Sequence, residues 1–289
     1  MGFGCNACGV IGCRIIDSPR ERLIAILTNN FIPCNGRFPI LISISAIFFT
    51  QISKSAANAP LNSVNSLMSA LLLTLFIVFS IAMTFFVSKI LSKTILKGLP
   101  SSFQLELPPF RRPQIGSVII RSIFDRTLFV LGRAVTIAAP AGIIIWLMTN
   151  ININQTSLLS GLAGFLNPFA KLMSFDGYIL LAFILGFPAN EIVIPIILMS
   201  YMSAGSLTGF DNLAQLHDIL ISNGWTFITA ICMIIFTLFH FPCGTTCLTI
   251  KKETGSIKWT VAAFIIPTVT GVILCMFVTG IANIVKILI

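Results

Sequence analysis

Long apolar stretches, separated by short polar segments, dominate the pattern of the chain. Four of them cover about residues 66–88, 128–148, 225–250 and 260–287. An α-helix of about 20 apolar residues crosses the hydrocarbon core of a bilayer. A fifth stretch, residues 38–52, is shorter and fits a tilted or broken span. The pattern therefore predicts an all-α, polytopic membrane protein.

The stretch over residues 225–250 contains a break at Pro242. Proline removes a backbone donor and the nearby Gly244 loosens the chain, so the helix should unwind there. Unwound backbone inside a bilayer is tolerated only where protein buries it or where it lines a cavity. The break therefore predicts a transport site, to which the chain would bring His240, Cys243, Thr245 and Cys247.

Composition supports a membrane protein and excludes two other classes. Residues are 56% hydrophobic and 9% charged, whereas an ordinary soluble domain is about 25% charged. The net charge of +9 does not indicate a nucleic-acid partner, because the basic residues gather in segments 89–126 and 251–258, between apolar stretches. That distribution is typical of cytoplasmic loops. The expected surrounding is a lipid bilayer.

The positions of lysine and arginine also predict the topology. Segments 89–126 and 251–258 should be cytoplasmic, and loops 150–175 and 202–223, which carry one basic residue between them, should be outside. Segment 178–202 then enters and leaves on one side, as a re-entrant hairpin of two half-helices broken at residues 186–190. The alternative is an ordinary span followed by a neutral cytoplasmic loop.

The segment between the first two long spans has its own pattern. Residues 105–113 contain three prolines, which disfavour a helix. Residues 115–126 alternate apolar and basic positions, as in an amphipathic helix on a membrane surface. We expect residues 101–127 to form a cytoplasmic connector.

Two short motifs occur twice and in the same order, which predicts an internal repeat. Gly2-Phe3-Gly4-Cys5-Asn6 is similar to Gly186-Phe187-Pro188-Ala189-Asn190, and Phe31-Ile32-Pro33-Cys34-Asn35-Gly36 is similar to Phe241-Pro242-Cys243-Gly244. Paired breaks in two halves of a transporter point to a binding site at their interface. The predicted organisation is a first gate-like repeat (1–60), a transmembrane span (61–100), the connector (101–127), and a second gate-like repeat with a C-terminal span (128–289).

The side chains at these breaks suit a metal ion. Thiols and a carboxylate are ligands for a borderline or soft transition metal, and the candidates are Cys5, Cys34, Glu191, Cys243 and Cys247. Zinc-finger spacing is absent, and conduction needs ligands that release the ion. We therefore expect a transported ion and no permanently bound cofactor.

Other residues have two interpretations each. Glu191 is an ionisable residue in an apolar segment, which marks a functional site or a structural partner of a basic group. Asn6 and Asn190 either support the ion path or cap the half-helices. His240 either packs or supports the site, and Thr245 adds a hydroxyl beside Cys243. Cys232 and Cys275 should pack as small apolar residues.

At these positions the sequence resembles the membrane region of the ferrous iron transport protein B (FeoB) family. The resemblance rests on the first glycine motif, on Glu106-Leu107-Pro108-Pro109-Phe110, on Gly186 to Glu191, and on Phe241 to Thr246 followed by Lys252-Glu253-Thr254-Gly255-Ser256-Ile257-Lys258-Trp259. It implies Fe²⁺ uptake across a bacterial cytoplasmic membrane, with gate cysteines at Cys5 and Cys243.

The chain departs from the family pattern in three ways. Ala7-Cys8-Gly9 replaces a Val-Pro-Ala sequence, and Asn190 replaces a lysine. The motif Gly-x₄-Gly-Lys-Ser/Thr, which cradles nucleotide phosphates, does not occur, so we expect no enzyme activity from the chain itself. The family's GTP-binding domain would then be a separately encoded partner, and a small accessory protein and a homo-oligomer are further expected partners.

Two other functions compete with iron transport. The first is a carrier of nucleosides or other organic solutes, because related gate domains occur in such proteins. It requires aromatic stacking and hydrogen-bond donors at the breaks, where the chain has thiols. The second is a non-transporting fragment or a subunit of a split transporter.

Overall fold

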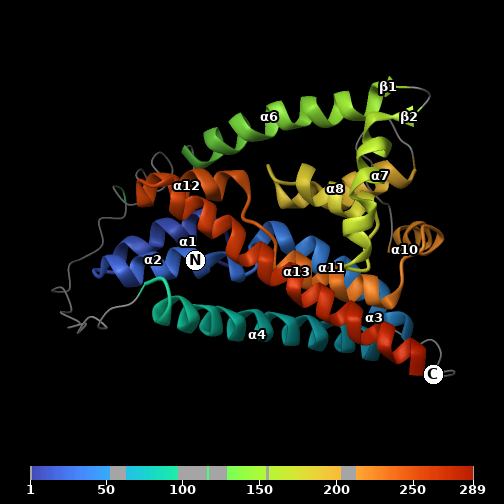
Figure 1. Ribbon diagram of the computed structural model, residues 1–289, viewed down its shortest axis with the longest axis horizontal. Helices are drawn as coiled ribbons and strands as arrows, with labels where there is room; N and C mark the ends of the chain where they lie inside the picture. The colour runs from blue at the N-terminus through green and yellow to red at the C-terminus, as the bar shows by residue number, and fades with distance from the viewer. Residues whose placement is uncertain are drawn as a thin grey trace.

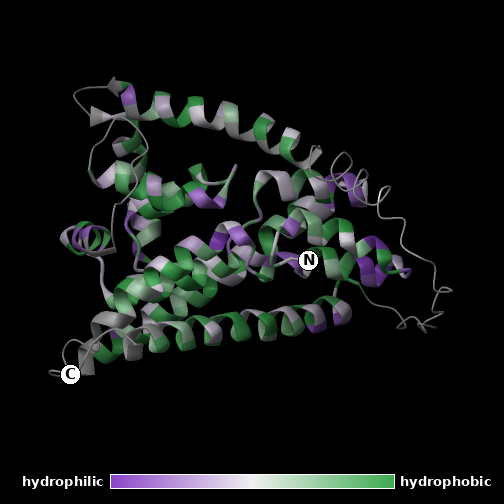
Figure 2. Cartoon of the chain, turned by 180° about the vertical axis from the view of Figure 1, so that it is seen from behind, coloured by the Kyte–Doolittle hydropathy of each residue, from purple (hydrophilic) through white to green (hydrophobic). Residues whose placement is uncertain are grey.

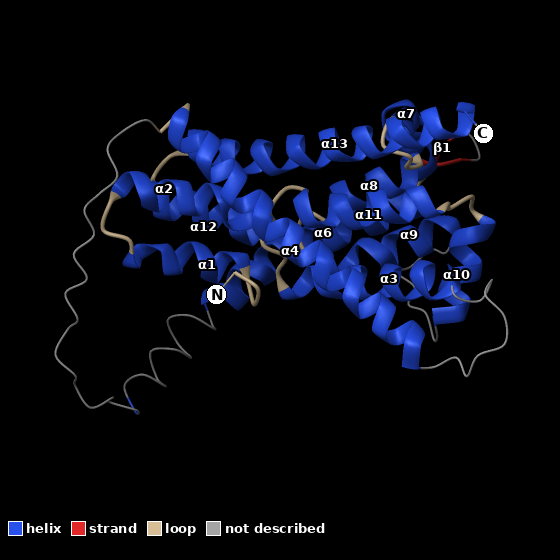
Figure 3. Cartoon of the chain, turned by 90° about the horizontal axis from the view of Figure 1, so that it is seen from below, coloured by secondary structure: helices blue, strands red, loops and turns tan. Residues whose placement is uncertain are grey.

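The computed structural model describes residues 2–52, 63–96, 129–153, 156–202 and 213–288, together with residue 116. The predicted connector (101–127) lies outside the described residues except for that position. Helices make up almost all of the described chain (Figures 1 and 3). Strands β1 (Asn152–Ile153) and β2 (Thr156–Ser157) form one short antiparallel pair, with Asn152 opposite Ser157.

The α-helices follow one another in a simple order. They are α1 (Asn6–Gly12), α2 (Pro19–Thr28), α3 (Phe38–Ile52), α4 (Ser63–Lys93), α6 (Phe129–Asn150), α7 (Leu158–Lys171), α8 (Gly177–Leu185), α9 (Val193–Tyr201), α10 (Leu213–Ser222), α11 (Phe227–Phe239), α12 (Gly244–Thr254) and α13 (Ile257–Leu288). Short 3₁₀ turns lie at Cys13–Ile15, Asn29–Phe31, Asn35–Arg37 and Asn190–Ile192.

The all-α membrane fold predicted from the pattern is confirmed. Four helical segments of the described chain are long and apolar enough to cross a membrane: Pro19–Phe48, Leu67–Lys93, Phe227–Thr254 and Ile257–Val285. The first of them begins well before residue 38, where the pattern placed the start of a short span. Three charged residues at positions 20–22 lower the hydropathy of its first half, α2, so the apolar pattern did not predict a span there.

Two broken helices, α2–α3 and α11–α12, form the centre of the fold and run in opposite directions (Figure 1). At one end, Pro19 of α2 and Thr254 of α12 line the same cavity. At the other end, Phe48 of α3 stacks on Trp225, just before α11, with ring centroids 6.1 Å apart. The two breaks therefore lie side by side between these ends, where the ring centroids of Phe31 and Phe239 are 5.7 Å apart.

Helices α4 and α13 flank this centre and carry apolar side chains on their outer faces. Leu75 and Phe85 of α4 and Phe277 of α13 are all more than half exposed. In Figure 2, hydrophilic colours are densest at the end that holds α2 and α12, and they also mark α10 near the opposite end. An apolar girdle with a polar end is the distribution expected of a bundle that faces lipid.

The segment predicted to be re-entrant folds as a hairpin. Helices α8 and α9 pack together on either side of the break at residues 186–189. Asp176, which caps α8, accepts a hydrogen bond from the hydroxyl of Tyr201 at the end of α9. The indole of Trp225 in turn donates to Tyr201 (2.8 Å). The two ends of the hairpin therefore meet, although the side of the membrane from which it enters stays a prediction.

Candidate functional site

The first break runs from Asn29 to Arg37 and contains two 3₁₀ turns but no α-helix. Pro33 lacks a backbone donor, and Cys34 adopts extended angles (φ −88°, ψ 168°) as the residue that precedes the turn Asn35–Arg37. The backbone N–H of Asn35 donates to the carbonyl of Gly4 (3.2 Å). The glycine motif near the N-terminus is thereby held against the first break.

The second break is built in the same way. Helix α11 ends at Phe239, and Cys243 adopts extended angles (φ −63°, ψ 160°) before α12 begins. The backbone N–H of Gly244 donates to the carbonyl of Phe187 (2.9 Å). In each half, the residue after the break cysteine therefore bonds to the backbone of a glycine motif.

The glycine motifs also match in conformation. Cys5 precedes α1 with φ −150° and ψ 127°, and Ala189 precedes the turn Asn190–Ile192 with φ −151° and ψ 120°. This agreement between segments far apart in the chain fits the predicted repeat. The two broken helices themselves run in opposite directions.

The structure gathers three of the predicted thiols. Cys243 lies near both Cys34 and Cys5. Cys34 is buried, and its sulfur lies 3.8 Å from the amide nitrogen of Asn190. The sulfur of Cys243 lies 3.2 Å from Oγ1 of Thr246.

The other predicted ligands lie around this group. Cys247 is one turn further along α12, and its thiol contacts the carbonyl of Pro242 (3.6 Å). Thr245 is buried in the first turn of α12. The exposed Glu191 lies against Gly36, with Cγ and Oε1 each 3.2 Å from where a Cβ of residue 36 would be. The carboxylate therefore stands beside the first break.

Within the described part of the chain, no three histidine, cysteine, aspartate or glutamate side chains are close enough to hold a metal ion. The five candidate ligands do not form one coordination shell in this conformation. Their arrangement instead follows the two breaks, as successive donors along a path would.

Asn190 links the two predicted halves through its side chain, and His240 supports it. Nε2 of His240 is 3.1 Å from Oδ1 of Asn190, whose nitrogen faces Cys34. Nδ1 of His240 faces two carbonyls of α11, at 3.1 and 3.0 Å. Because both ring nitrogens have partners and the ring is buried, His240 supports Asn190 and has no free nitrogen for an ion.

Neither asparagine of the glycine motifs caps a helix with its side chain. The capping positions are Cys5 and Ala189, and neither has a side-chain capping bond. Instead, the buried amide of Asn6 contacts Oδ1 of Asn30 (3.1 Å). Cys232 and Cys275 are fully buried between α11 and α13, which confirms their predicted packing role.

Sequence reasoning missed Arg37, which is wholly buried between the breaks. Its guanidinium donates to carbonyl oxygens of Asn30, Leu238, His240 and Phe241 and to Oδ1 of Asn30, at 2.9–3.2 Å. A signal was present, because Arg37 is the only charged residue between Arg22 and Lys54. The rule that singled out Glu191, an ionisable group at membrane depth, applies equally to Arg37.

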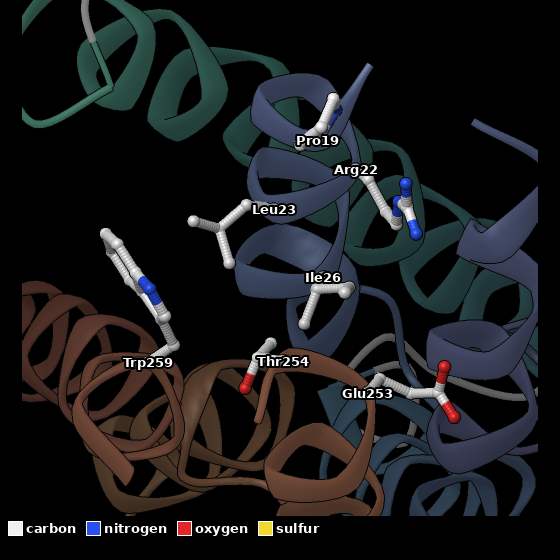
Figure 4. A pocket seen from close by; sticks show the side chains of 7 residues that line it. All are labelled: Pro19, Arg22, Leu23, Ile26, Glu253, Thr254 and Trp259. Atoms are coloured by element: carbon white, nitrogen blue, oxygen red, sulfur yellow. The ribbon is translucent and has the colours of Figure 1, made fainter. Parts of the chain in front are cut away.

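Two cavities lie away from the thiols. One, of about 230 Å³, lies between α2, α12 and α13, at the end of α12 that carries Lys251 and Lys252. Leu23, Ile26 and Trp259 face one another there (Figure 4). Next to it, Arg14 binds both carboxylate oxygens of Glu253 at 2.6 and 2.7 Å. The other, of about 300 Å³, borders the open end of the hairpin at Asp176 and Tyr201. Neither cavity is lined by a candidate ligand.

Two family models match successive parts of the chain. Residues 73–125 match the model described as ferrous iron transport protein B C terminus, and residues 131–257 match the gate model described as nucleoside recognition. No solved structure matches the chain.

Curated relatives match almost the whole chain. An Fe(2+) transporter FeoB of Staphylococcus aureus is 31% identical over 95% of this chain and 38% of its own length. An Fe(2+) transporter FeoB of Methanocaldococcus jannaschii is 25% identical over 98% of this chain and 40% of its own length. The chain thus spans about two fifths of these relatives. It is a homologue of the C-terminal membrane region of the ferrous iron transport protein B family.

Proposed function

We propose that the chain is the membrane part of a ferrous iron uptake transporter, in which Fe²⁺ passes along the break cysteines and Glu191. The observation that carries the proposal is the similar placement of the two break cysteines: Cys34 directly precedes the turn Asn35–Arg37 that leads into α3, and Cys243 directly precedes α12. The relatives are named as Fe(2+) transporters. Thiols suit this borderline ion better than they suit alkali or alkaline-earth cations.

The path would run through the gap between the two halves. Cys5, Cys34 and Cys243 are near one another, and Glu191 stands beside the first break. Ligands offered singly or in pairs bind an ion weakly enough to release it. We place the chain in a cytoplasmic membrane, with the end that carries Lys251 and Lys252 inside.

The energy source and partners also belong to this proposal. The relatives are more than twice as long as the chain. We propose that a separately encoded GTP-binding half acts with it, and that a small accessory protein and a second copy of the chain are further partners.

Replacing Glu191 by glutamine is the first test. We expect Fe²⁺ uptake into proteoliposomes to fall by about 10-fold or more, because the amide keeps the shape and removes the anionic oxygen of the path. Uptake is measured with and without the co-expressed GTP-binding half. Equal initial rates for the variant and the wild type would remove Glu191 from the path.

Replacing Gly36 by alanine tests the position of the same carboxylate. The new methyl group would stand 3.2 Å from Glu191, so this side chain has to shift by a few tenths of an ångström. We expect uptake to fall about tenfold, the lower limit for groups that orient a metal ligand, with thermal stability nearly unchanged. Gly280→Ala, with nothing within 4 Å of the added carbon, is the control and should transport normally.

A solute carrier is the second candidate, because the gate match carries the description nucleoside recognition. The aromatic rings near the second break do not favour it, since Phe183 and Phe241 pack on His240, with centroids 5.0 and 5.3 Å away. Competition of a nucleoside mixture with Fe²⁺ uptake separates the two functions. Inhibition by nucleosides without any iron flux would favour the carrier.

A further inference from the structure

The place where the two breaks meet holds a group of five oxygens, here called the oxygen cluster. Its members are the backbone oxygens of Asn30, Leu238, His240 and Phe241 and the side-chain oxygen of Asn30. The first break supplies two of them and the second break, with the end of α11, supplies three. The cluster therefore exists only where both halves come together.

Arg37 fills the oxygen cluster with its guanidinium. The side chain has no exposed surface, and within the described residues the oxygens that accept from it are all neutral. A buried charge is strongly unfavourable unless nearby dipoles compensate for the lost water. The five oxygens must therefore create a strongly negative potential at this point.

Such a group of oxygens is a binding site for a hard cation. Unwound carbonyls in the broken helices of transporters coordinate Na⁺, and carbonyl rings select among alkali ions in channels. Oxygen ligands suit Na⁺, K⁺ and Mg²⁺, whereas thiols suit softer ions. Without Arg37, the oxygen cluster would offer hard cations a site near Cys34 and Cys243, which both lie close to Arg37.

We propose that the oxygen cluster is a cation site, that Arg37 occupies it as a tethered cation, and that this occupancy denies hard cations a site on the path. The fixed charge repels a second cation, so an ion that stops here needs the extra binding free energy of the thiols. The role in selectivity rests on the proposed Fe²⁺ transport, whereas the occupancy of the cluster does not.

Thermal unfolding of the purified chain in detergent tests the occupancy directly. Arg37→Ala leaves the oxygens and a void, and we expect the unfolding temperature to fall by roughly 5–15 °C. Methylguanidinium chloride, or KCl at matched ionic strength, should restore at least half of that loss in a saturable manner. The wild type should not respond.

Two further substitutions keep the test decisive if the alanine variant does not fold. Arg37→Met fills the space without charge, and Arg37→Lys retains a cation. We expect the lysine variant to unfold at a higher temperature than the methionine variant, and added cations to leave the methionine variant unchanged. A methionine variant as stable as the wild type, or no cation response in the alanine variant, overturns the proposal.

The same substitutions at Arg14 provide the control. Its side chain is 61% exposed and pairs with Glu253, whose side chain is 11% exposed, so its charge is compensated by a carboxylate and not by neutral oxygens. We expect a smaller fall in unfolding temperature and no response to added cations. A cation response at Arg14 equal to that at Arg37 also overturns the proposal.

Flux measurements test the role in selectivity. In proteoliposomes, the alanine variant should admit K⁺ or Mg²⁺ at least about fivefold faster than the wild type, and the lysine variant should not. Unchanged hard-cation flux in the alanine variant contradicts this role. If the wild type moves no Fe²⁺ at all, the proposed function fails, while the unfolding experiment still decides whether the cluster is a cation site.

Discussion

Replacing Cys243 by serine is expected to lower the initial rate of Fe²⁺ uptake by at least about 10-fold. The serine hydroxyl is a harder and weaker ligand for this ion than a thiol. The fold should survive, because the hydroxyl can keep the contact that Cys243 makes with Thr246 (3.2 Å). Uptake of radioactive iron into proteoliposomes measures the effect, and the thermal unfolding temperature shows that the fold is intact.

Cys13→Ser is the matched control for this experiment. The Cys13 thiol donates to the carbonyl of Gly9 (3.3 Å), a bond that serine can make. Cys13 lies in the 3₁₀ turn Cys13–Ile15 that follows α1, outside the two breaks. Its replacement should leave uptake unchanged. If Cys243→Ser transports as well as Cys13→Ser does, the break cysteines are not on the path.

Gly177→Ala is expected to destabilise the protein by roughly 3 kcal/mol or more. An added Cβ at this position would lie 1.8 Å from the carbonyl oxygen of Ala163 and 2.7 Å from its carbonyl carbon. Both atoms belong to the backbone of α7, which cannot turn away as a side chain would. The helices α7 and α8 must therefore separate. We expect the unfolding temperature to fall by roughly 6–12 °C.

Gly161→Ala, also in α7, provides the comparison. Nothing lies within 4 Å of a Cβ added there, and alanine in a helix is favoured over glycine by roughly 0.5–1 kcal/mol. This variant should be as stable as the wild type or slightly more stable. Equal unfolding temperatures for the two glycine variants would contradict the close contact of α7 and α8.

The features that could be predicted from the sequence are those that depend on residues close together in the chain. Pro33 and Pro242 remove backbone donors wherever the chain folds, so the two breaks could be recognised from the local pattern. The same holds for α4 and α13, whose apolar stretches are long and uninterrupted. The first half of the first broken helix, α2, was missed because its charged first turn lies at the polar end of the molecule.

The contacts that define the site could not be predicted in this way. Arg37 reaches oxygens 201 to 204 residues away in the chain, and nothing local indicates that partner. The link from His240 to Asn190 likewise spans 50 residues. The contacts of Arg37 depend on the opposite directions of the two broken helices. The motifs predict that these helices are broken, but they do not predict how the helices are oriented.

Helix α12 has a mechanical consequence for the cysteine that precedes it. From Cys243 to Glu253 the helix is a stiff arm of about 15 Å, with the Arg14 ion pair at its far end and the hydrogen bond from Gly244 to Phe187 near its base. A tilt of about 10° about that base moves the far end by roughly 2.6 Å but the cysteine by only a small fraction of this. A partner that binds the far end of α12, near Lys251 and Lys252, would therefore displace that end much further than the thiol of Cys243. A large movement at the partner's binding site would change the distance between the thiol and a bound ion only slightly.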